Sequence, residues 1–171
     1  LMTLGLDQRW RRLALDLAGV GPGDVLIDLA CGTGDLAELA AARGARVVGT
    51  DFAGGMLRAA RARSGAIPFV QGDGAALPFA AGAADVLTCG FALRNFVSLP
   101  EVFAEMARVL APGGRLALIE VDRPAWGVVR AGHSLYFDRV VPIVSSNVSV
   151  LNVDFSTVML KRVNSSFCNS S

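Results

Sequence analysis

Apolar runs alternate with alanine-rich segments through most of the chain. The runs predict strands near residues 25–29, 46–51, 67–71, 84–89 and 114–121. The intervening periodicity predicts helices near 6–18, 35–43, 54–63, 98–110 and 127–141. Short buried strands separated by amphipathic helices are typical of a parallel sheet. We therefore predict an α/β fold with a mostly parallel central sheet flanked by helices.

Acidic residues follow three of the predicted strands. Asp28 lies at the end of the first strand, Asp51 at the end of the second, and Asp73 just after the third. Right-handed crossovers place the carboxyl ends of parallel strands along one edge of the sheet. The three carboxylates are therefore expected at the edge where such folds bind ligands.

A glycine-rich turn connects the first strand to its helix, in Asp28-Leu-Ala-Cys-Gly32-Thr33-Gly34. Glycines let a ligand approach the backbone, and the start of the following helix offers unpaired N–H groups. A tight turn without a ligand is the alternative. The recurring strand-end acids favour a binding site.

Two nucleotide-type ligands compete for this turn, because Gly32 to Ala37 also satisfies the relaxed G-x-G-x-x-A pattern of dinucleotide sites. Asp35 stands in the first helical turn, where a carboxylate would repel a pyrophosphate. S-adenosylmethionine (SAM) has no phosphate and carries an ammonium and a sulfonium. The charge of Asp35 therefore favours SAM over a dinucleotide.

The later acids fit the nucleoside part of such a ligand. A carboxylate at Asp51 can accept both ribose hydroxyls, at the spacing from Gly32 that dinucleotide folds use. Phe52 and Met56 are expected either against the adenine or in the core. Asp73, within Gly-Asp-Gly, is expected either to accept the adenine amino group or to act as a turn aspartate.

Composition narrows the class of protein. The 171 residues fit one domain, 53% are hydrophobic, and no uninterrupted apolar run is long enough to span a bilayer. A net charge of +1 with scattered arginines argues against nucleic-acid binding. His133 is the only histidine and no C-x-x-C pair occurs, so we predict no metal site. Without a signal-like start, a cytoplasmic location is expected.

The last part of the chain differs in composition, with neither Gly nor Ala after Gly132. We predict a main domain over residues 1–144 and an atypical tail over 145–171. Alternating apolar positions in the tail predict one or two strands at a sheet edge near 148–150, 153–155 and 158–160, followed by disorder from 164. An incomplete sheet would expose an edge strand and favour a homodimer.

Residues 1 to about 144 resemble the ubiquinone/menaquinone biosynthesis C-methyltransferases, a family of class I SAM-dependent methyltransferases. The more general motifs are the glycine turn, Gly49-Thr-Asp51-Phe, Gly72-Asp73, and Pro112-Gly-Gly114 at the end of Glu105-Met-Ala-Arg-Val-Leu-Ala-Pro-Gly-Gly. The most particular are Gly90-Phe-Ala-Leu-Arg94-Asn95 and Tyr136-Phe-Asp-Arg-Val-Val-Pro142. The resemblance implies a Rossmann-like fold, with C-terminal strands that are incomplete or atypical in this chain.

The resemblance also implies SAM contacts at Thr33 with its neighbouring glycines, at Asp51, and at Asp73 with Gly74. At Gly90 the family often has a serine, so here only a backbone contact is expected. The implied reaction is methyl transfer to a ring carbon of a prenylated quinol precursor, such as demethylmenaquinol.

Within that reaction, we expect Arg94 to stabilise the quinolate and Asn95 to orient the ring or the motif. The alternatives are a salt bridge that holds the loop for Arg94 and a turn role for Asn95. His133, one helical turn from Tyr136, is a candidate general base, against a histidine buried in the core or facing solvent.

Two other functions stay open: a class I methyltransferase acting on another small hydrophobic acceptor, and a SAM-binding domain without catalysis. A lipid acceptor implies transient contact with a membrane surface, at the inner face, with residues 126–129 as one candidate segment.

Overall fold

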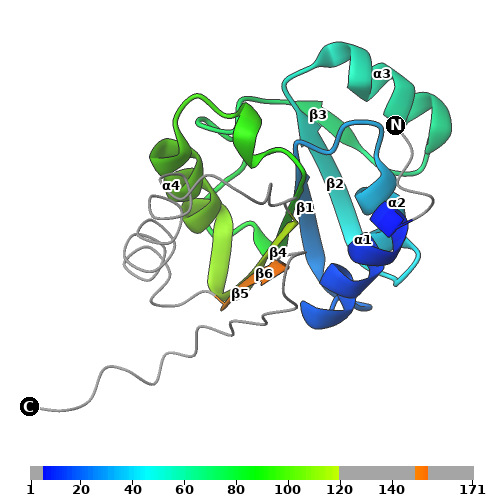
Figure 1. Cartoon of the computed structure of the whole chain (residues 1–171), viewed down its shortest axis with the longest axis horizontal. Coiled ribbons are helices and arrows are strands. Elements are labelled where there is room, and N and C mark those ends of the chain that lie inside the picture. The colour runs from blue at the N-terminus through cyan, green and yellow to red at the C-terminus, as the bar shows by residue number, and fades with distance from the viewer. Residues whose placement is uncertain (1–5, 120–148, 154–171) are drawn as a thin grey trace, which may run out of the picture.

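The computed structural model describes residues 6–119 and 149–153. Their order is α1 (Leu6–Leu17), β1 (Val25–Leu29), α2 (Asp35–Ala41), β2 (Arg46–Asp51), α3 (Gly54–Arg63), β3 (Phe69–Gln71), β4 (Ala84–Gly90), the 3₁₀ turn η1 (Leu93–Asn95), α4 (Leu99–Val109), β5 (Leu110–Ile119) and β6 (Ser149–Val153). The strands form one sheet in the order β3-β2-β1-β4-β5-β6, and every neighbouring pair is parallel (Figure 1). The predicted mostly parallel α/β sheet is confirmed.

Most predicted elements lie where the hydrophobic pattern placed them, but one strand begins late and one helix ends early for local reasons. The third strand was expected from residue 67 but begins at Phe69. Pro68 has no N–H to donate, and the N–H of Ile67 bonds to the Ser64 carbonyl instead. Helix α2 ends at Ala41, where a turn closes on Gly44 with φ +88°.

The junction of α4 and β5 was predicted as a helix, a turn and then a strand. The helix begins after Ser98 with Pro100 in its first turn, as expected. It ends at Val109, and β5 already begins at Leu110. The Pro-Gly-Gly segment therefore lies inside the strand, where the register with β4 shifts between Ala84 and Val86.

The tail contributes one described strand, β6, which lies parallel to β5 with Arg115 opposite Ser149 and Ile119 opposite Val153. One or two strands were predicted here from alternations at 148–150, 153–155 and 158–160, and β6 overlaps the first and reaches the first residue of the second. Residues 154–160 lie outside the described residues. The boundary at residue 144 and the predictions for residues 164–171 stay predictions. The expected helix over 127–141 lies outside the described residues.

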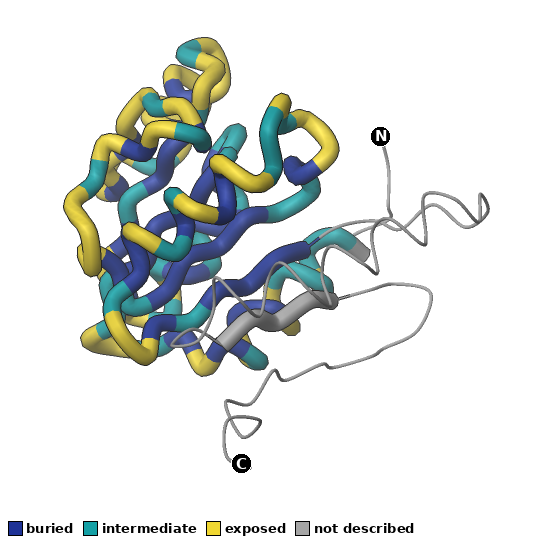
Figure 2. The backbone as a smooth tube through the Cα atoms, turned by 90° about the vertical axis from the view of Figure 1, so that its left-hand side faces the viewer, coloured by how far each residue is buried: buried dark blue, intermediate teal, exposed yellow. Residues whose placement is uncertain are grey.

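The core has two layers, one on each face of the sheet. Helices α1, α2 and α3 pack over one face around Leu15, Leu36 and Leu57. Helix α4 covers the other through Val102, Phe103 and Met106. Figure 2 shows the buried strands between the more exposed outer elements. Within the described residues, no helix is long and apolar enough to cross a membrane.

The strand order reverses between β1 and β4. The chain builds outward from β1 through β2 to β3, then returns to β4 on the other side of β1 and continues to β5 and β6. Open α/β sheets bind ligands outside the carboxyl ends of the strands at such a reversal. The glycine turn follows the carboxyl end of β1, and the Gly90 to Asn95 segment follows that of β4.

Candidate functional site

The turn after β1 is built from backbone hydrogen bonds and left-handed residues. Cys31 donates its N–H to the Thr50 carbonyl of β2, and Gly34 donates to the Cys31 carbonyl. Positive φ angles occur at Ala30 (53°), Gly32 (55°) and Gly34 (87°). The chain thus reverses within a few residues and starts α2 at Asp35.

The two glycines of this turn serve different purposes. A Cβ on Gly34 would lie 3.1 Å from the Phe69 ring, so Gly34 allows the turn to pack against β3. A Cβ on Gly32 would meet no atom within 4 Å. Gly32 therefore borders open space, as the predicted close approach of a ligand requires, and Thr33 lies half-buried between the two.

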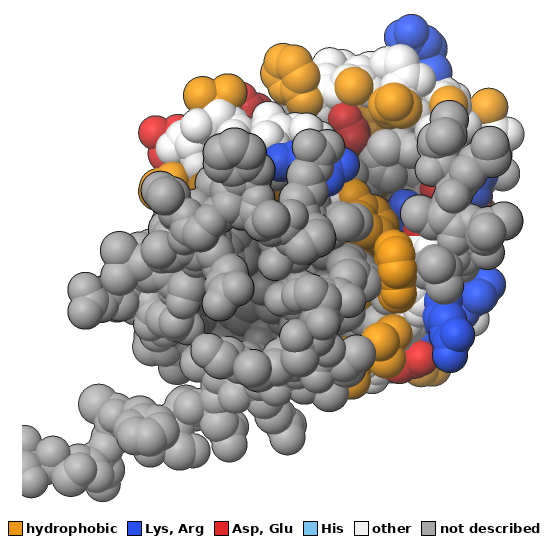
Figure 3. All heavy atoms as spheres, viewed as in Figure 1, with side chains coloured by type: hydrophobic (Ala, Val, Ile, Leu, Met, Phe, Trp, Pro, Cys, Tyr) orange, Lys and Arg blue, Asp and Glu red, His pale blue; other side chains and the backbone are white. Residues whose placement is uncertain are grey.

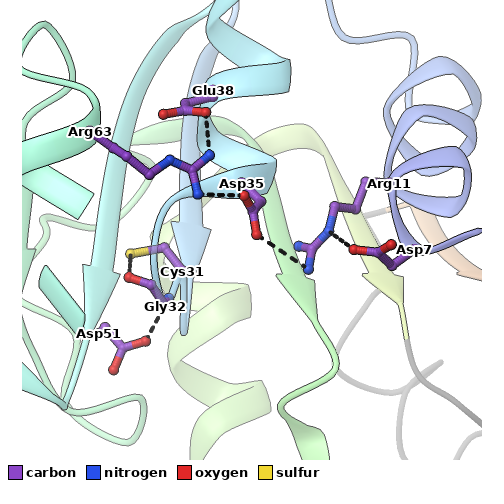
Figure 4. A network of polar contacts seen from close by, with 8 residues as sticks. All are labelled: Asp7, Arg11, Cys31, Gly32, Asp35, Glu38, Asp51 and Arg63. Carbon is purple, nitrogen blue, oxygen red and sulfur yellow. Dashed lines mark hydrogen bonds and ion pairs between the residues drawn. The ribbon is translucent and has the colours of Figure 1, made fainter. Parts of the chain in front are cut away.

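Asp51, the last residue of β2, holds the same turn. Its Oδ2 accepts the Gly32 N–H at 2.8 Å, and its Oδ1 accepts the Ala53 N–H at 2.8 Å (Figure 4). Each carboxylate oxygen has a further lone pair. Asp51 therefore has a structural role in the turn that the sequence did not reveal. It can still accept hydrogen bonds from the predicted ribose hydroxyls.

Asp28 was expected as an open strand-end acid, but it is only 1% exposed. Its Oδ1 accepts a hydrogen bond of 2.7 Å from the Thr88 hydroxyl, and its Oδ2 has no hydrogen-bond partner. Burial raises the pKa of Asp28 to about 7, while the Thr88 hydrogen bond and then the charge of Arg11 oppose that rise. The β1–β4 register places Asp28 opposite Thr88, which sequence alone did not identify.

Phe52 and Met56 were expected either against adenine or in the core. Phe52 is 75% exposed and Met56 49% exposed, so the core alternative is wrong. Both follow the end of β2, Phe52 directly and Met56 in the first turn of α3. They are available as apolar surface for a ligand held at Asp51.

The segment after β3 adopts the turn that was one alternative for Asp73. The exposed Asp73 accepts the Ala75 N–H at 2.9 Å through Oδ1. This bond leaves the second carboxylate oxygen available for the predicted adenine amino group. Gly74 is buried, and a Cβ there would lie 2.7 Å from the Phe96 ring, so its predicted contact with a cofactor would be through the backbone.

Asp35 carried the sequence argument against a dinucleotide, and the structure changes that argument. Its Oδ1 pairs with Arg63 Nη1 at 2.7 Å, and the same guanidinium reaches Glu38 at 2.6 Å (Figure 4). The charge of Asp35 is thus largely compensated inside the protein. Discrimination between SAM and a dinucleotide cannot rest on Asp35.

The segment after β4 contains the predicted catalytic residues. Gly90 ends the strand, and Phe91 adopts a left-handed backbone with φ +60°. Arg94 and Asn95 form the exposed end of η1, in which the Asn95 N–H bonds to the Ala92 carbonyl. Both predicted residues therefore lie past the carboxyl end of β4, beside the strand-order reversal.

Arg11 of α1 also reaches this place, and the sequence reasoning gave it no role. Its Cζ lies 5.1 Å from the centre of the Phe91 ring, and Nη1 lies 3.8 Å from the position of a Cβ on Gly90. None of the motifs named above includes Arg11, which lies in the run Trp10-Arg-Arg12.

Several predictions fall outside the described residues, among them the candidate base His133 and its neighbour Tyr136. Among the described residues, no group of three His, Cys, Asp or Glu side chains could hold a metal ion. Cys31 is a buried free thiol, and burial raises the pKa of this thiol far above its usual range.

The model of the ubiE/COQ5 methyltransferase family matches residues 1–158. The chain belongs to this family. The match extends beyond residue 144, where the sequence motifs of the resemblance ended, and includes β6.

Named relatives of this ubiE/COQ5 family member are quinone methyltransferases. The chain is 44% identical over 155 residues to the demethylmenaquinone methyltransferase of Thermus thermophilus, covering 87% of this chain and 70% of that one. It is 39% identical over 148 residues to the 2-phytyl-1,4-naphtoquinone methyltransferase of Thermosynechococcus vestitus, covering 82% and 66%. The chain thus spans about two thirds of the length of these relatives.

A solved structure supports the architecture of this family member. The YcgJ protein of Bacillus subtilis superposes with a TM-score of 0.64 at 22% identity, covering 78% of this chain and 58% of that one. At this identity the likeness concerns the fold alone. The predicted Rossmann-like class I methyltransferase fold is confirmed.

Proposed function

We propose that the chain is a SAM-dependent C-methyltransferase that methylates a ring carbon of a prenylated quinol precursor in quinone biosynthesis. One observation carries the proposal: Gly32 borders open space at the strand-order reversal and is tied to Asp51 by a 2.8 Å hydrogen bond. Family membership and the names of the relatives supply the reaction class.

The residues at this edge fit SAM. Asp51 would take the ribose hydroxyls, Asp73 the adenine amino group, and the exposed Phe52 and Met56 the adenine face. Gly32, Thr33, Gly34 and Gly90 would line the amino-acid side, where Asp28 Oδ2 is a buried oxygen without a hydrogen-bond partner among the described residues. When bound, SAM supplies an electrophilic methyl group on a sulfonium.

The protein must make the acceptor carbon nucleophilic and align it with that methyl. A ring carbon reacts once a neighbouring hydroxyl has lost its proton, because the phenolate pushes electron density onto the carbon. Arg94, at the end of β4, would stabilise the quinolate, and Asn95 would orient the ring. Orienting the ring and stabilising the quinolate are tasks of positioning and electrostatics, and they are most effective where water is excluded.

A prenylated acceptor resides in a lipid surface, and the chain has apolar surface to approach one. Phe52 and Met56 are assigned to the adenine, but Val97, the most exposed large hydrophobic side chain of the described residues, has no part in the cofactor assignment. Figure 3 shows hydrophobic side chains among charged ones at the surface. We propose transient contact with the inner face of a membrane by a cytoplasmic protein. We also propose that two copies of the chain form a homodimer through a sheet edge.

Calorimetric titration with SAM, followed by a methyl-transfer assay on demethylmenaquinol, tests the function. Binding with turnover on the quinol supports it. Binding with turnover only on another hydrophobic acceptor, or binding alone, contradicts the quinol assignment. Binding of NAD without SAM would contradict the cofactor assignment.

Arg94→Ala tests the catalytic role within that assay. We expect kcat to fall about 100-fold, as for loss of one donor that stabilises a developing oxyanion. The Kd of SAM should stay unchanged, because Arg94 is assigned to the acceptor. A variant that methylates at the wild-type rate would show that Arg94 only holds its loop.

A further inference from the structure

Arg11 brings a positive charge from α1 to the carboxyl ends of the strands. Its guanidinium lies over the Phe91 ring, with Nη1 close to Gly90 of β4. The charge of Arg11 also lowers the pKa of Asp28, although burial outweighs this effect. Arg11 therefore belongs electrostatically to the site at the end of β1 and β4.

The guanidinium is poorly satisfied by the described residues. Nε lies 3.9 Å from Asp7 Oδ2, and Nη2 lies 4.0 Å from Asp35 Oδ2, both beyond hydrogen-bond distance (Figure 4). Nε is buried and has no hydrogen-bond partner. Buried N–H groups are nearly always hydrogen-bonded, so this one points to a partner that the described residues do not supply.

The neighbouring carboxylate does not fill that need. Asp35 is bound at 2.7 Å by Arg63, which also binds Glu38, so Asp35 gives its short contact to another guanidinium. Arg11 is left with ion pairs of 3.9 and 4.0 Å and no short hydrogen bond to either carboxylate. Stacking on Phe91 occupies the face of the guanidinium and leaves the in-plane N–H groups for an acceptor.

A planar fork of donors is complementary to a carboxylate. Close by, Asp28 Oδ2 is a buried acceptor that also has no hydrogen-bond partner. An unused cationic donor beside an unused acidic acceptor matches the two ends of an amino-acid zwitterion.

We propose that Arg11 binds the α-carboxylate in the methionine part of SAM. The proposal rests on the proposed function and adds to it a residue of α1 that anchors the amino-acid end of the cofactor. A purely structural alternative exists, in which Arg11 only holds Phe91 in its left-handed conformation. The two roles differ in their dependence on the ligand's carboxylate.

Calorimetry with two ligands separates the two roles. The first is SAM, and the second is 5′-methylthioadenosine, which has the adenosine and the sulfur but no amino-acid end. For Arg11→Met we expect the Kd of SAM to rise about tenfold or more, as for loss of a charge-assisted hydrogen-bond pair. The Kd of 5′-methylthioadenosine should change less than about twofold. Arg12→Met is the matched control, because Arg12 is the exposed next residue of α1, and both ligands should bind it as they bind the wild type.

Equal weakening of both ligands by Arg11→Met would overturn the proposal in favour of the loop-holding role. An unchanged affinity for SAM would overturn it too. If Arg11→Met does not fold, the wild-type protein provides the test: removal of the carboxylate from SAM, as in decarboxylated SAM, should weaken binding about tenfold, and equal affinity would contradict the contact. A wild-type protein that binds neither SAM nor 5′-methylthioadenosine would instead overturn the proposed function.

Discussion

Arg108 and Arg11 are both helical arginines near the ends of strands, but their surroundings differ. Arg108 donates to both Glu105 oxygens at 2.6 and 2.7 Å, and to the carbonyls of Phe79 and Leu77 at 2.8 and 3.1 Å. Glu105 in turn accepts the Leu77 N–H at 2.7 Å. Arg11 has two carboxylates near 4 Å and a buried Nε without a hydrogen-bond partner.

The hydrogen-bonding groups around Arg108 are satisfied by one another, whereas some of those around Arg11 are not satisfied by the described residues. Around Arg108, donors and acceptors satisfy one another and fix the segment after β3 onto α4. Around Arg11, Asp28 and Gly32, the described residues leave a donor, an acceptor and a space unused. Unused polar capacity at the strand-order reversal indicates binding, whereas satisfied capacity indicates structure.

Two glycine substitutions should distinguish most strongly between a structural position and a binding position. A Cβ on Gly49 would lie 2.5 Å from the Phe69 ring and 3.0 Å from Cys31 Sγ, so Gly49→Ala should lower the free energy of unfolding by about 3 kcal/mol. Gly32→Ala meets no neighbour, and its left-handed backbone should cost about 1–2 kcal/mol. Urea denaturation measures both values.

For SAM binding we expect the opposite order, with the larger effect from Gly32→Ala and the smaller from Gly49→Ala. Gly32→Ala fills the space assigned to the ligand and should weaken SAM binding about tenfold or more. Gly49→Ala, where enough folded protein remains, should bind SAM nearly as the wild type does. Tight SAM binding by Gly32→Ala would mean that the space beside Gly32 is not the binding site.

The buried Asp28 should make stability depend on pH. Because burial raises its pKa to about 7 in the folded protein, the folded state holds a proton that the unfolded chain has already lost. The contribution of this carboxyl to stability is therefore greatest at low pH and falls as pH rises toward 7. The slope is at most about 1.4 kcal/mol per pH unit.

Asp28→Asn removes this titration and keeps an oxygen that can accept the Thr88 hydroxyl. Urea denaturation at pH 5 and pH 6 should show a smaller loss of stability with pH in the variant than in the wild type. Parallel pH profiles for the two proteins would show that Asp28 is ionised in both the folded and the unfolded states.

Arg108→Met should have the smallest effect on binding. It releases Glu105 and two carbonyls of the segment after β3, so we expect a lower unfolding midpoint in urea. The Kd of SAM, measured by calorimetry on the folded variant, should remain within about twofold of the wild type. A large loss of affinity would extend the binding site to this network.

Much of the fold could be predicted because the hydrophobic pattern depends on local geometry. The ranges 25–29, 46–51 and 54–63 match β1, β2 and α3. The errors arose where backbone hydrogen bonds decide, as at Pro68, which shortens β3, and at Leu110, where β5 begins without a separate turn. Neither effect changes the hydrophobic periodicity.

The sequence could predict which strand ends form the site, but not which side chains pair with one another there. Sequence placed Asp51 and the glycine turn together, because topology fixes which strand ends meet. It could not reveal that Asp35 pairs with Arg63 from α3, or that Arg11 approaches Gly90 from α1. Such pairings join residues far apart in the chain and depend on side-chain packing that no short motif records.

The pairing of β6 with β5 has a consequence for how the protein folds. Residues 120–148 separate these two neighbouring strands, so a connection of that length must close before β6 can add its hydrogen bonds. The pairs β1–β2, β2–β3 and β4–β5 form through shorter connections, and β5 presents an unpaired edge until β6 arrives. During that interval a second chain competes with residues 149–153 for the same edge, so the yield of refolded monomer should fall as the protein concentration rises.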